Sequence, residues 1–213
     1  PREVSRKELL ERAEVSPQIL STLVTKGIFE NYGKEISRLS NNPLHTESPY
    51  PLSPIQQKAY NEIIDRFSQK ETVLLHGVTS SGKTEIYIHL IDTVLKQGRQ
   101  VLYLVPEIAL TTQLTTRLQR VFGNKLSIYH SKFTDNERVE IWNDLLHDKG
   151  AQIILGVRSS IFLPFRDLGL VIVDEEHEGS YKQQEPSPRY HARNAAIVLA
   201  SMHGAKTLLG TAT

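Results

Sequence analysis

From about residue 54 onward, short apolar runs alternate with longer segments in which apolar residues recur every three or four positions. The short runs predict strands buried on both faces of a sheet, and the longer pattern predicts amphipathic helices. We expect strands at TVLLHG, QVLYLVP, LSIYH, QIILGV, LVIVDE and KTLLGTA, with helices near 54–68 and at KTEIYIHLIDTVLKQ, IALTTQLTTRLQRVF, DNERVEIWNDLLHDK and YHARNAAIVLASMHG. This alternation predicts one α/β domain over 54–213, with a parallel sheet covered by helices on both faces.

The first 40 residues follow a different pattern, that of two short helices separated by a three-residue turn. Ser5 and Glu8 predict a capping box for the first helix, and Ser16 with Pro17 predicts the start of the second. The segment IFENYGKEISRL that follows fits a strand pair. Together these elements predict a small winged-helix domain at 1–40.

Charge leaves the role of this winged helix open. Seven Lys or Arg and seven Glu lie between residues 1 and 48, so the segment carries no net charge. A domain that reads DNA sequence by itself is usually more basic. The winged helix therefore either touches nucleic acid or serves only as a packing or protein-contact module. Residues 41–53 are rich in proline and predict a linker to the α/β domain.

Composition excludes several classes of protein. The chain has no cysteine, which excludes disulfides, thiol catalysis and Cys-ligated zinc. It has neither an apolar run of about eighteen residues nor a secretory leader, so we expect no membrane partner and a cytoplasmic setting. The net charge of +1 gives no bulk electrostatic case for binding nucleic acid. Because the chain starts at Pro1 and its one methionine is Met202, we expect it to be a piece of a longer protein.

The stretch GVTSSGKT at 77–84 fits the phosphate-loop pattern and lies between a predicted strand and a predicted helix. Two glycines let successive backbone N–H groups and the helix N-terminus surround phosphate oxygens. In this motif the lysine reaches the β- and γ-phosphates and the threonine hydroxyl binds Mg²⁺. The sequence therefore predicts ATP and Mg²⁺ as cofactors, with nucleotide contacts from Gly77, Thr79, Ser81, Gly82, Lys83 and Thr84.

Two carboxylates complete the predicted catalytic set. Asp174 and Glu175 end the apolar strand LVIV, and ligands of open α/β sheets gather at the carboxyl ends of strands. We expect Asp174 to bind Mg²⁺ and Glu175 to orient the attacking water, with Lys83 as the third catalytic residue. The long separation between Lys83 and Asp174 favours a RecA-like sheet over a compact small-molecule kinase. Upstream, the amide of Gln56 has the donor and acceptor needed to read an adenine edge.

Other predicted strand ends lie at the same edge of the sheet. PEIALT includes Thr111, and GVRSS includes Arg158 and Ser159; hydroxyls, backbone N–H groups and one arginine there can hold a nucleic-acid backbone. His130 and His177 have no zinc-binding spacing.

Taken in order, Gln56, GVTSSGKT, PEIALT, GVRSS, DEEH and GTAT resemble the first motor lobe of superfamily 2 DExH helicases. HSKFTDNERVEIW, GVRSSIFLPF and DEEHEGSYKQQEPSPRYHAR are similar to the primosomal replication-restart helicases within that superfamily. The resemblance implies ATP-driven 3′ to 5′ unwinding and restart of replication at stalled forks by primosome assembly. It implies as partners single-stranded and forked DNA, primosome proteins and single-stranded DNA-binding protein, in the bacterial cytoplasm at the nucleoid.

The resemblance also assigns roles to the loop after the acidic motif. That loop is similar to an aromatic-rich loop that couples DNA to ATP hydrolysis, and it predicts DNA-binding or coupling residues in addition to Thr111, Arg158 and Ser159. Tyr181 and Tyr190 supply the rings of this loop, and we expect the ring of Tyr181 to stack on a base. We also expect Glu176 and His177 to link the acidic motif to the 210–213 strand end. The predicted set is His177, Tyr181, Lys182, Arg189, Tyr190 and Arg193.

The family's second lobe with its arginine finger, its zinc-binding segment and its domain for a DNA 3′ end are expected elsewhere in the longer protein, so zinc is expected only there. We therefore expect this chain alone to bind nucleotide weakly and to hydrolyse ATP negligibly. Two alternatives remain: another superfamily 2 DNA motor of the branch-migration or restriction type, or a winged-helix regulator with a nucleotide-sensing domain.

Overall fold

The computed structural model describes residues 6–13, 16–29, 46–78, 81–130, 133–147 and 151–212. The chain divides into two compact units, 1–38 and 39–213, and each is described by itself. Among the helices of the described residues, none combines the length and the apolar character needed to cross a bilayer.

The first unit contains the two expected helices, α1 (Arg6–Ala13) and α2 (Pro17–Thr25). Ser16 is extended and precedes Pro17 in the first turn of α2, as the sequence predicts, although its side chain makes no capping hydrogen bond. The chain leaves α2 through Gly27, whose φ of +69° lies in the left-handed region. The strand pair expected after α2 falls on residues beyond Phe29 that lie outside the described residues.

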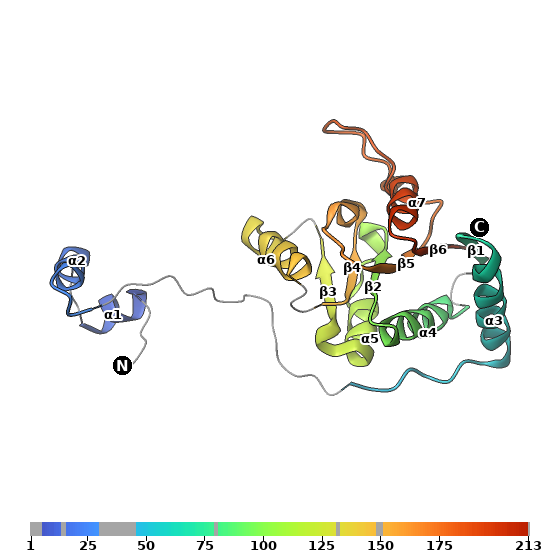
Figure 1. Cartoon of the computed structure of the whole chain (residues 1–213), viewed down its shortest axis with the longest axis horizontal. Coiled ribbons are helices and arrows are strands. Elements are labelled where there is room, and N and C mark those ends of the chain that lie inside the picture. The colour runs from blue at the N-terminus through green and yellow to red at the C-terminus, as the bar shows by residue number, and fades with distance from the viewer. Residues whose placement is uncertain are drawn as a thin grey trace. The chain divides into compact units, whose positions relative to one another are not determined.

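The second unit is built on a six-stranded sheet in the order β1-β6-β5-β2-β4-β3 (Figure 1). All neighbouring strands are parallel. The buried apolar runs form the central strands, as expected for a sheet covered on both faces. The strands are β1 (Thr72–His76), β2 (Gln100–Leu104), β3 (Leu126–Tyr129), β4 (Ile153–Gly156), β5 (Leu168–Val173) and β6 (Lys206–Thr211).

Helices cover the sheet in two layers. One apolar core joins the strands to α3 (Pro54–Gln69), α4 (Lys83–Lys96) and α5 (Thr112–Phe122), and the other joins them to α6 (Asp135–Leu146) and α7 (Ala192–Met202). Alternation along β2 shows the division, because Val101 and Tyr103 belong to the first core and Leu102 and Leu104 to the second. The sheet covered on both faces is therefore confirmed.

One predicted helix is interrupted. The pattern in IALTTQLTTRLQRVF predicts a continuous helix, but the structure has a short 3₁₀ turn, η1 (Glu107–Ala109), and then α5 from Thr112. The extended residue Thr111 separates them, and its hydroxyl accepts a hydrogen bond from the backbone N–H of Leu114 at 3.2 Å. A side-chain cap of this kind satisfies an N–H that has no partner inside the helix, and so it starts a new helix.

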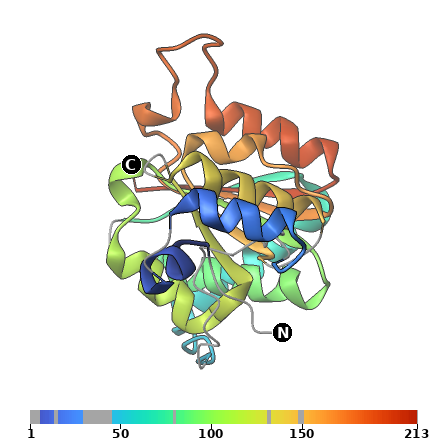
Figure 2. The same ribbon diagram turned by 90° about the vertical axis from the view of Figure 1, so that its left-hand side faces the viewer.

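The segment between β5 and α7 projects from the body of the second unit as a narrow loop (Figure 2). An antiparallel bridge between Lys182 and His191 joins the outgoing and returning segments of the loop at its base. Farther out, the side-chain amide of Gln183 donates to the carbonyl oxygens of Pro186 at 2.8 Å and Pro188 at 3.2 Å. The loop therefore has internal hydrogen bonds along its length.

Candidate nucleotide site and nucleic-acid face

The phosphate loop connects β1 to α4. Lys83, the first residue of α4, donates from Nζ to the carbonyl oxygen of Gly77 at 2.7 Å, and Nζ lies 3.8 Å from Oε1 of Glu175. Gly82 has a φ of +81°, and a Cβ there would lie 2.2 Å from Nε2 of Gln56. The left-handed backbone favours glycine at that position, whereas the Gln56 amide is the end of a flexible side chain and can move aside. Thr79 lies outside the described residues, and Ser81 is exposed.

Gln56 ties α3 to this loop. Its Oε1 accepts a hydrogen bond from the backbone N–H of Ser53 at 2.8 Å, which completes a capping box at the start of α3. Its Nε2 donates to the carbonyl oxygen of Gly82 at 3.3 Å. The predicted adenine reader therefore lies beside the phosphate loop, with both ends of its amide hydrogen-bonded within the protein.

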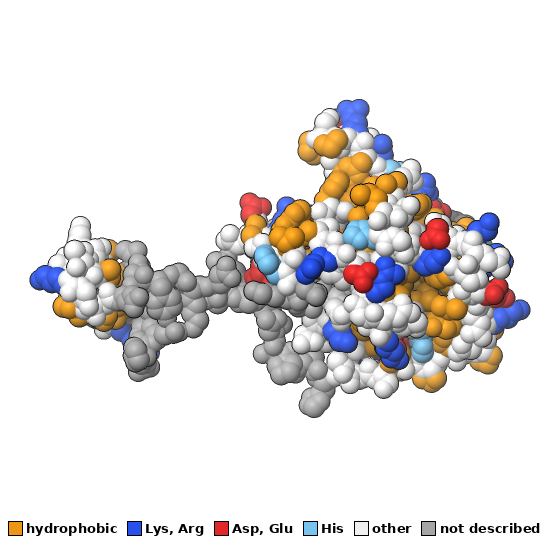
Figure 3. Space-filling model, in the orientation of Figure 1, with side chains coloured by type: hydrophobic (Ala, Val, Ile, Leu, Met, Phe, Trp, Pro, Cys, Tyr) orange, Lys and Arg blue, Asp and Glu red, His pale blue; other side chains and the backbone are white. Residues whose placement is uncertain are grey.

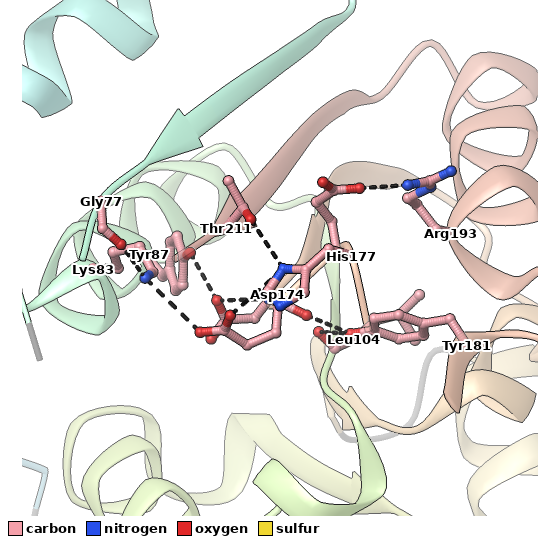
Figure 4. Close-up of polar contacts among 11 residues, drawn as sticks. Gly77, Lys83, Tyr87, Leu104, Asp174, His177, Tyr181, Arg193 and Thr211 are labelled. Atoms are coloured by element: carbon pink, nitrogen blue, oxygen red, sulfur yellow. Dashed lines mark hydrogen bonds and ion pairs between the residues drawn. The ribbon is translucent and has the colours of Figure 1, made fainter. Parts of the chain in front are cut away.

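The carboxylate of Asp174, just beyond β5, accepts hydrogen bonds from two tyrosine hydroxyls, and Figure 4 shows the one from Tyr87. Tyr87 on α4 donates to Oδ1 at 3.0 Å, and Tyr103 on β2 donates to Oδ2 at 3.2 Å. Burial raises the pKa of Asp174 above its ordinary value, and the hydrogen bonds from the two tyrosines oppose that rise. Burial and the charge of Asp174 also raise the pKa of Tyr87 and Tyr103, so both phenols stay protonated and donate.

Glu175 occupies a left-handed turn, with a φ of +47° that non-glycine residues seldom adopt. Such backbone strain is found where a site requires one side-chain direction. Here the turn brings the half-buried carboxylate of Glu175 toward Lys83. The three predicted catalytic residues therefore lie together, at the carboxyl edge of the sheet.

The expected link from the acidic motif to β6 is confirmed. The backbone N–H of Glu176 donates to the carbonyl oxygen of Gly210 at 2.8 Å, and Nδ1 of His177 lies 3.0 Å from the hydroxyl of Thr211. Arg193 near the start of α7 adds an ion pair to Glu176 at 2.5 Å, visible in Figure 4. The acidic motif thus touches both the last strand and the helix that follows the projecting loop.

Tyr181 does not present its ring to solvent. The side chain is only 1% exposed, and its hydroxyl donates to the carbonyl oxygens of Asp174 at 2.6 Å and Leu104 at 3.2 Å. The expectation that its ring meets a base is wrong for this structure, because no face of the ring is accessible. Tyr181 instead joins the projecting loop to the ends of β5 and β2, and this contact is compatible with a coupling role.

The remaining predicted residues lie around the same edge. Arg158 and Ser159 are half-buried in the 3₁₀ turn η3 (Arg158–Phe162), which follows β4, and Tyr190 is half-buried at the base of the loop. Lys182 is half-buried at the loop's bridge. Arg189 is exposed and pairs with Glu185 at 2.7 Å.

A cleft of about 710 Å³ lies beside the acidic motif. The predicted Mg²⁺ ligands Thr84 and Asp174 both line it, together with Glu175 and Thr111. Oxygen donors from the first turn of α4 and the end of β5 therefore border one space, and this donor set fits a hard cation such as Mg²⁺.

Sequence reasoning missed a second group in this cleft. Arg117 on α5 forms a bidentate ion pair with Glu85 at 2.9 and 2.8 Å, and its guanidinium lies 3.8 Å from the ring centroid of Tyr50. No sequence spacing predicts this contact, because Tyr50, Glu85 and Arg117 come from three segments far apart in the chain. Tyr87, in contrast, is four residues after Lys83, and that spacing places it on the phosphate-loop face of α4.

Comparison with known proteins identifies the class. The family model for DEAD/DEAH box helicases matches residues 53–213, so the chain belongs to this family of ATP-using helicases. A second family model, for the winged-helix domain of PriA helicase in Bacteroidota, matches residues 1–36, in agreement with the expected winged helix.

Within the helicases, the chain is similar to a particular group of curated proteins. The chain is 40% identical over 210 residues to the replication restart protein PriA of Bacillus subtilis (strain 168), covering 97% of this chain and 26% of that protein. It is 42% identical over 207 residues to replication restart protein PriA of Haemophilus influenzae, covering 94% of this chain and 28% of that protein. The chain therefore spans about a quarter of the length of the curated relatives it matches.

Solved structures support the fold. A structure of RecG bound to a three-way DNA junction superposes with a TM-score of 0.57 at 24% identity, covering 78% of this chain and 21% of RecG. The restriction-modification enzyme LlaGI, solved with a DNA substrate mimic, gives a TM-score of 0.54 at 18% identity, covering 77% of this chain and 18% of LlaGI. The sheet is thus the expected RecA-like fold.

Proposed function

We propose that this chain supplies the winged helix and the first motor lobe of an ATP-dependent DNA helicase that restarts replication at stalled forks. The observation that carries the proposal is the meeting of Lys83, Asp174 and Glu175 at one strand edge, in a chain similar to replication restart proteins. The domain division is 1–40 for the winged helix, 41–53 for the linker and 54–213 for the motor lobe.

The nucleotide phosphates bind between the phosphate loop and the acidic motif. Lys83 leaves the Gly77 carbonyl to reach the β- and γ-phosphates, and the N-terminus of α4 supplies N–H donors. Thr84 and Asp174 hold Mg²⁺, which neutralises phosphate charge when it is bound. Gln56 reads the adenine from the start of α3, with Nε2 leaving the Gly82 carbonyl and Oε1 using its second lone pair.

Glu175 orients the attacking water and accepts its proton. Its left-handed turn and its 3.8 Å separation from Lys83 support this role, because both keep the carboxylate on the phosphate side. Tyr87 and the backbone N–H of Glu175 both donate to Oδ1 of Asp174. Oδ2 accepts from Tyr103 and keeps a further lone-pair direction for the metal.

DNA binds along the edge formed by Thr111, Arg158, Ser159 and the projecting loop. The hydrogen bond from the Tyr181 hydroxyl to the carbonyl of Asp174 connects the loop to the acidic motif. The ion pair between Arg193 and Glu176 is a second connection. Movement of the loop on DNA therefore changes the acidic motif, which is the coupling that a translocating motor requires.

The partners we propose for the whole protein are single-stranded and forked DNA, primosome proteins and single-stranded DNA-binding protein, in the cytoplasm of a bacterium at the nucleoid. Translocation runs 3′ to 5′, with zinc bound only outside this chain.

Nucleotide binding and hydrolysis test the proposal. We expect this chain to bind a fluorescent ATP analogue weakly in the presence of Mg²⁺, and to hydrolyse ATP negligibly because one lobe supplies half of a catalytic cleft. In the whole protein, single-stranded DNA should stimulate hydrolysis, Lys83→Ala should abolish it, and Glu175→Gln should retain binding without turnover.

Lys96→Ala is the matched control, because that lysine is exposed on the same helix and pairs with Asp92, four residues earlier. Unchanged nucleotide affinity in Lys83→Ala would contradict the site. Fast DNA-stimulated turnover by this chain alone would contradict the need for a second lobe.

A further inference from the structure

An aromatic pair lies at the carboxyl edge of the sheet, outside the residues assigned above to nucleotide binding. Phe162, the last residue of η3, is 57% exposed. Its ring centroid lies 5.0 Å from that of Tyr190, with the two planes inclined by 75°. The pair therefore joins the turn after β4 to the base of the projecting loop.

The outward direction of Phe162 is imposed by its neighbours. Ile161 and Leu163 are 6% and 5% exposed and belong to the second core. With both neighbours buried, the side chain between them is held at the surface, where its position is fixed by the packed turn. A single exposed apolar residue needs no explanation, but a rigid exposed ring paired edge to face with a second ring is a preformed contact surface.

The surroundings of this pair favour an anion that carries a flat apolar group. Arg158 begins the same turn and is close enough to Tyr190 to oppose the pKa increase that burial produces in that phenol. Figure 3 shows hydrophobic side chains at the base of the projecting loop, with Lys and Arg side chains along the loop. Nucleobases stack on aromatic faces while phosphates bind such cations, and single-stranded nucleic acid offers both groups at regular spacing.

We propose that Phe162 and Tyr190 form a stacking platform for a nucleobase of single-stranded DNA whose backbone is held by Arg158. This inference rests on the proposed function and assigns base contact to a residue outside the projecting loop. Phe162 provides the exposed ring that the buried Tyr181 does not.

Fluorescence anisotropy with this chain tests the platform. The probes are a labelled oligo-dT and an abasic oligonucleotide of equal length and charge, at low salt. We expect the unchanged chain to prefer the base-containing strand. Phe162→Leu, which keeps apolar volume but removes the ring, should lose about 5- to 150-fold in oligo-dT affinity and nothing on the abasic strand, as for about 1–3 kcal/mol of stacking. Phe162→Trp should retain the preference.

Arg158→Ala separates this inference from the proposed function, because a lost phosphate contact should weaken both oligonucleotides alike and reduce the salt dependence of binding. If Phe162→Leu binds both strands as the unchanged chain does, or if the unchanged chain does not distinguish them, the platform is overturned while DNA binding stands. If the unchanged chain binds neither strand, the DNA-binding part of the proposed function is contradicted and the platform with it.

Discussion

At the scale of single residues, the acidic motif depends on hydroxyl groups that reach it from both sides of the sheet. Tyr87 and Tyr103 donate to the Asp174 carboxylate from the first core, and Tyr181 donates to the Asp174 carbonyl from the second. A buried carboxylate requires such partners because hydration is lost. The chain places three phenols there, and burial raises the pKa of each above its ordinary value, so all three remain hydrogen-bond donors well above neutral pH.

We expect Tyr87→Phe to lower the free energy of unfolding by about 1.5–3 kcal/mol, because it removes a hydrogen bond to a charged group and keeps the ring. Tyr60→Phe is the control, since it removes a neutral bond between the hydroxyls of Tyr60 and Thr93 and should cost only about 0.5–1.5 kcal/mol. Urea denaturation of both variants measures the difference. Equal losses would show that the Asp174 charge contributes nothing to the Tyr87 bond.

At the scale of elements, the segment before α3 packs on the motor lobe. The backbone N–H of Glu47 donates to the carbonyl oxygen of Arg120 at 2.7 Å, and the Tyr50 ring lies under the guanidinium of Arg117. Arg117 in turn pairs with Glu85, which is adjacent to Thr84 in the first turn of α4. The proline-rich segment is thus connected, through one stacked arginine, to the helix of the phosphate loop.

Removing the Tyr50 ring should release this segment. We expect Tyr50→Ala to speed hydrogen exchange at the Glu47 amide by about 2- to 30-fold, corresponding to about 0.5–2 kcal/mol for the cation–π contact. Tyr50→Phe keeps the ring and should exchange at the original rate. An unchanged rate in Tyr50→Ala would show that the stacking on Arg117 does not hold the segment in place.

At the scale of the whole molecule, the two compact units should respond differently to ligand. All of the described residues of the nucleotide site lie in the unit 39–213, and the helices α1 and α2 belong to the other. A ligand stabilises only the cooperative unit that binds it.

A Mg²⁺-bound ATP analogue at ten times its dissociation constant should therefore stabilise the second unit by about 1.4 kcal/mol, which raises its Tm by about 3–6 °C. Chelation of Mg²⁺ with EDTA and the variant Asp174→Ala should each remove most of the increase. Differential scanning calorimetry measures the transition, with hydrogen exchange of α1 and α2 as the unaffected internal reference. A shift that survives both changes would show that Asp174 and the metal do not take part in binding.

Most of the fold was predictable from the sequence. The six strands and the motor-lobe helices lie where the apolar pattern puts them, within a few residues, because buried strands and amphipathic helices have different periods. The break before α5 was not predictable from the sequence. The helical pattern of apolar residues continues across Thr111, but the Thr111 side chain caps a new helix there.

The sequence by itself determined the class of this protein: the phosphate loop, the acidic strand end and their order along an α/β chain need only local chemistry to be recognised. Only the tertiary structure decided which tyrosine is buried and which ring is exposed. Tyr181 and Phe162 both lie in short 3₁₀ turns that follow strands, and no periodicity distinguishes them. The parallel register brings Leu104 beside Val173, so the Tyr181 hydroxyl meets two strand ends that are 70 residues apart in sequence (174 − 104).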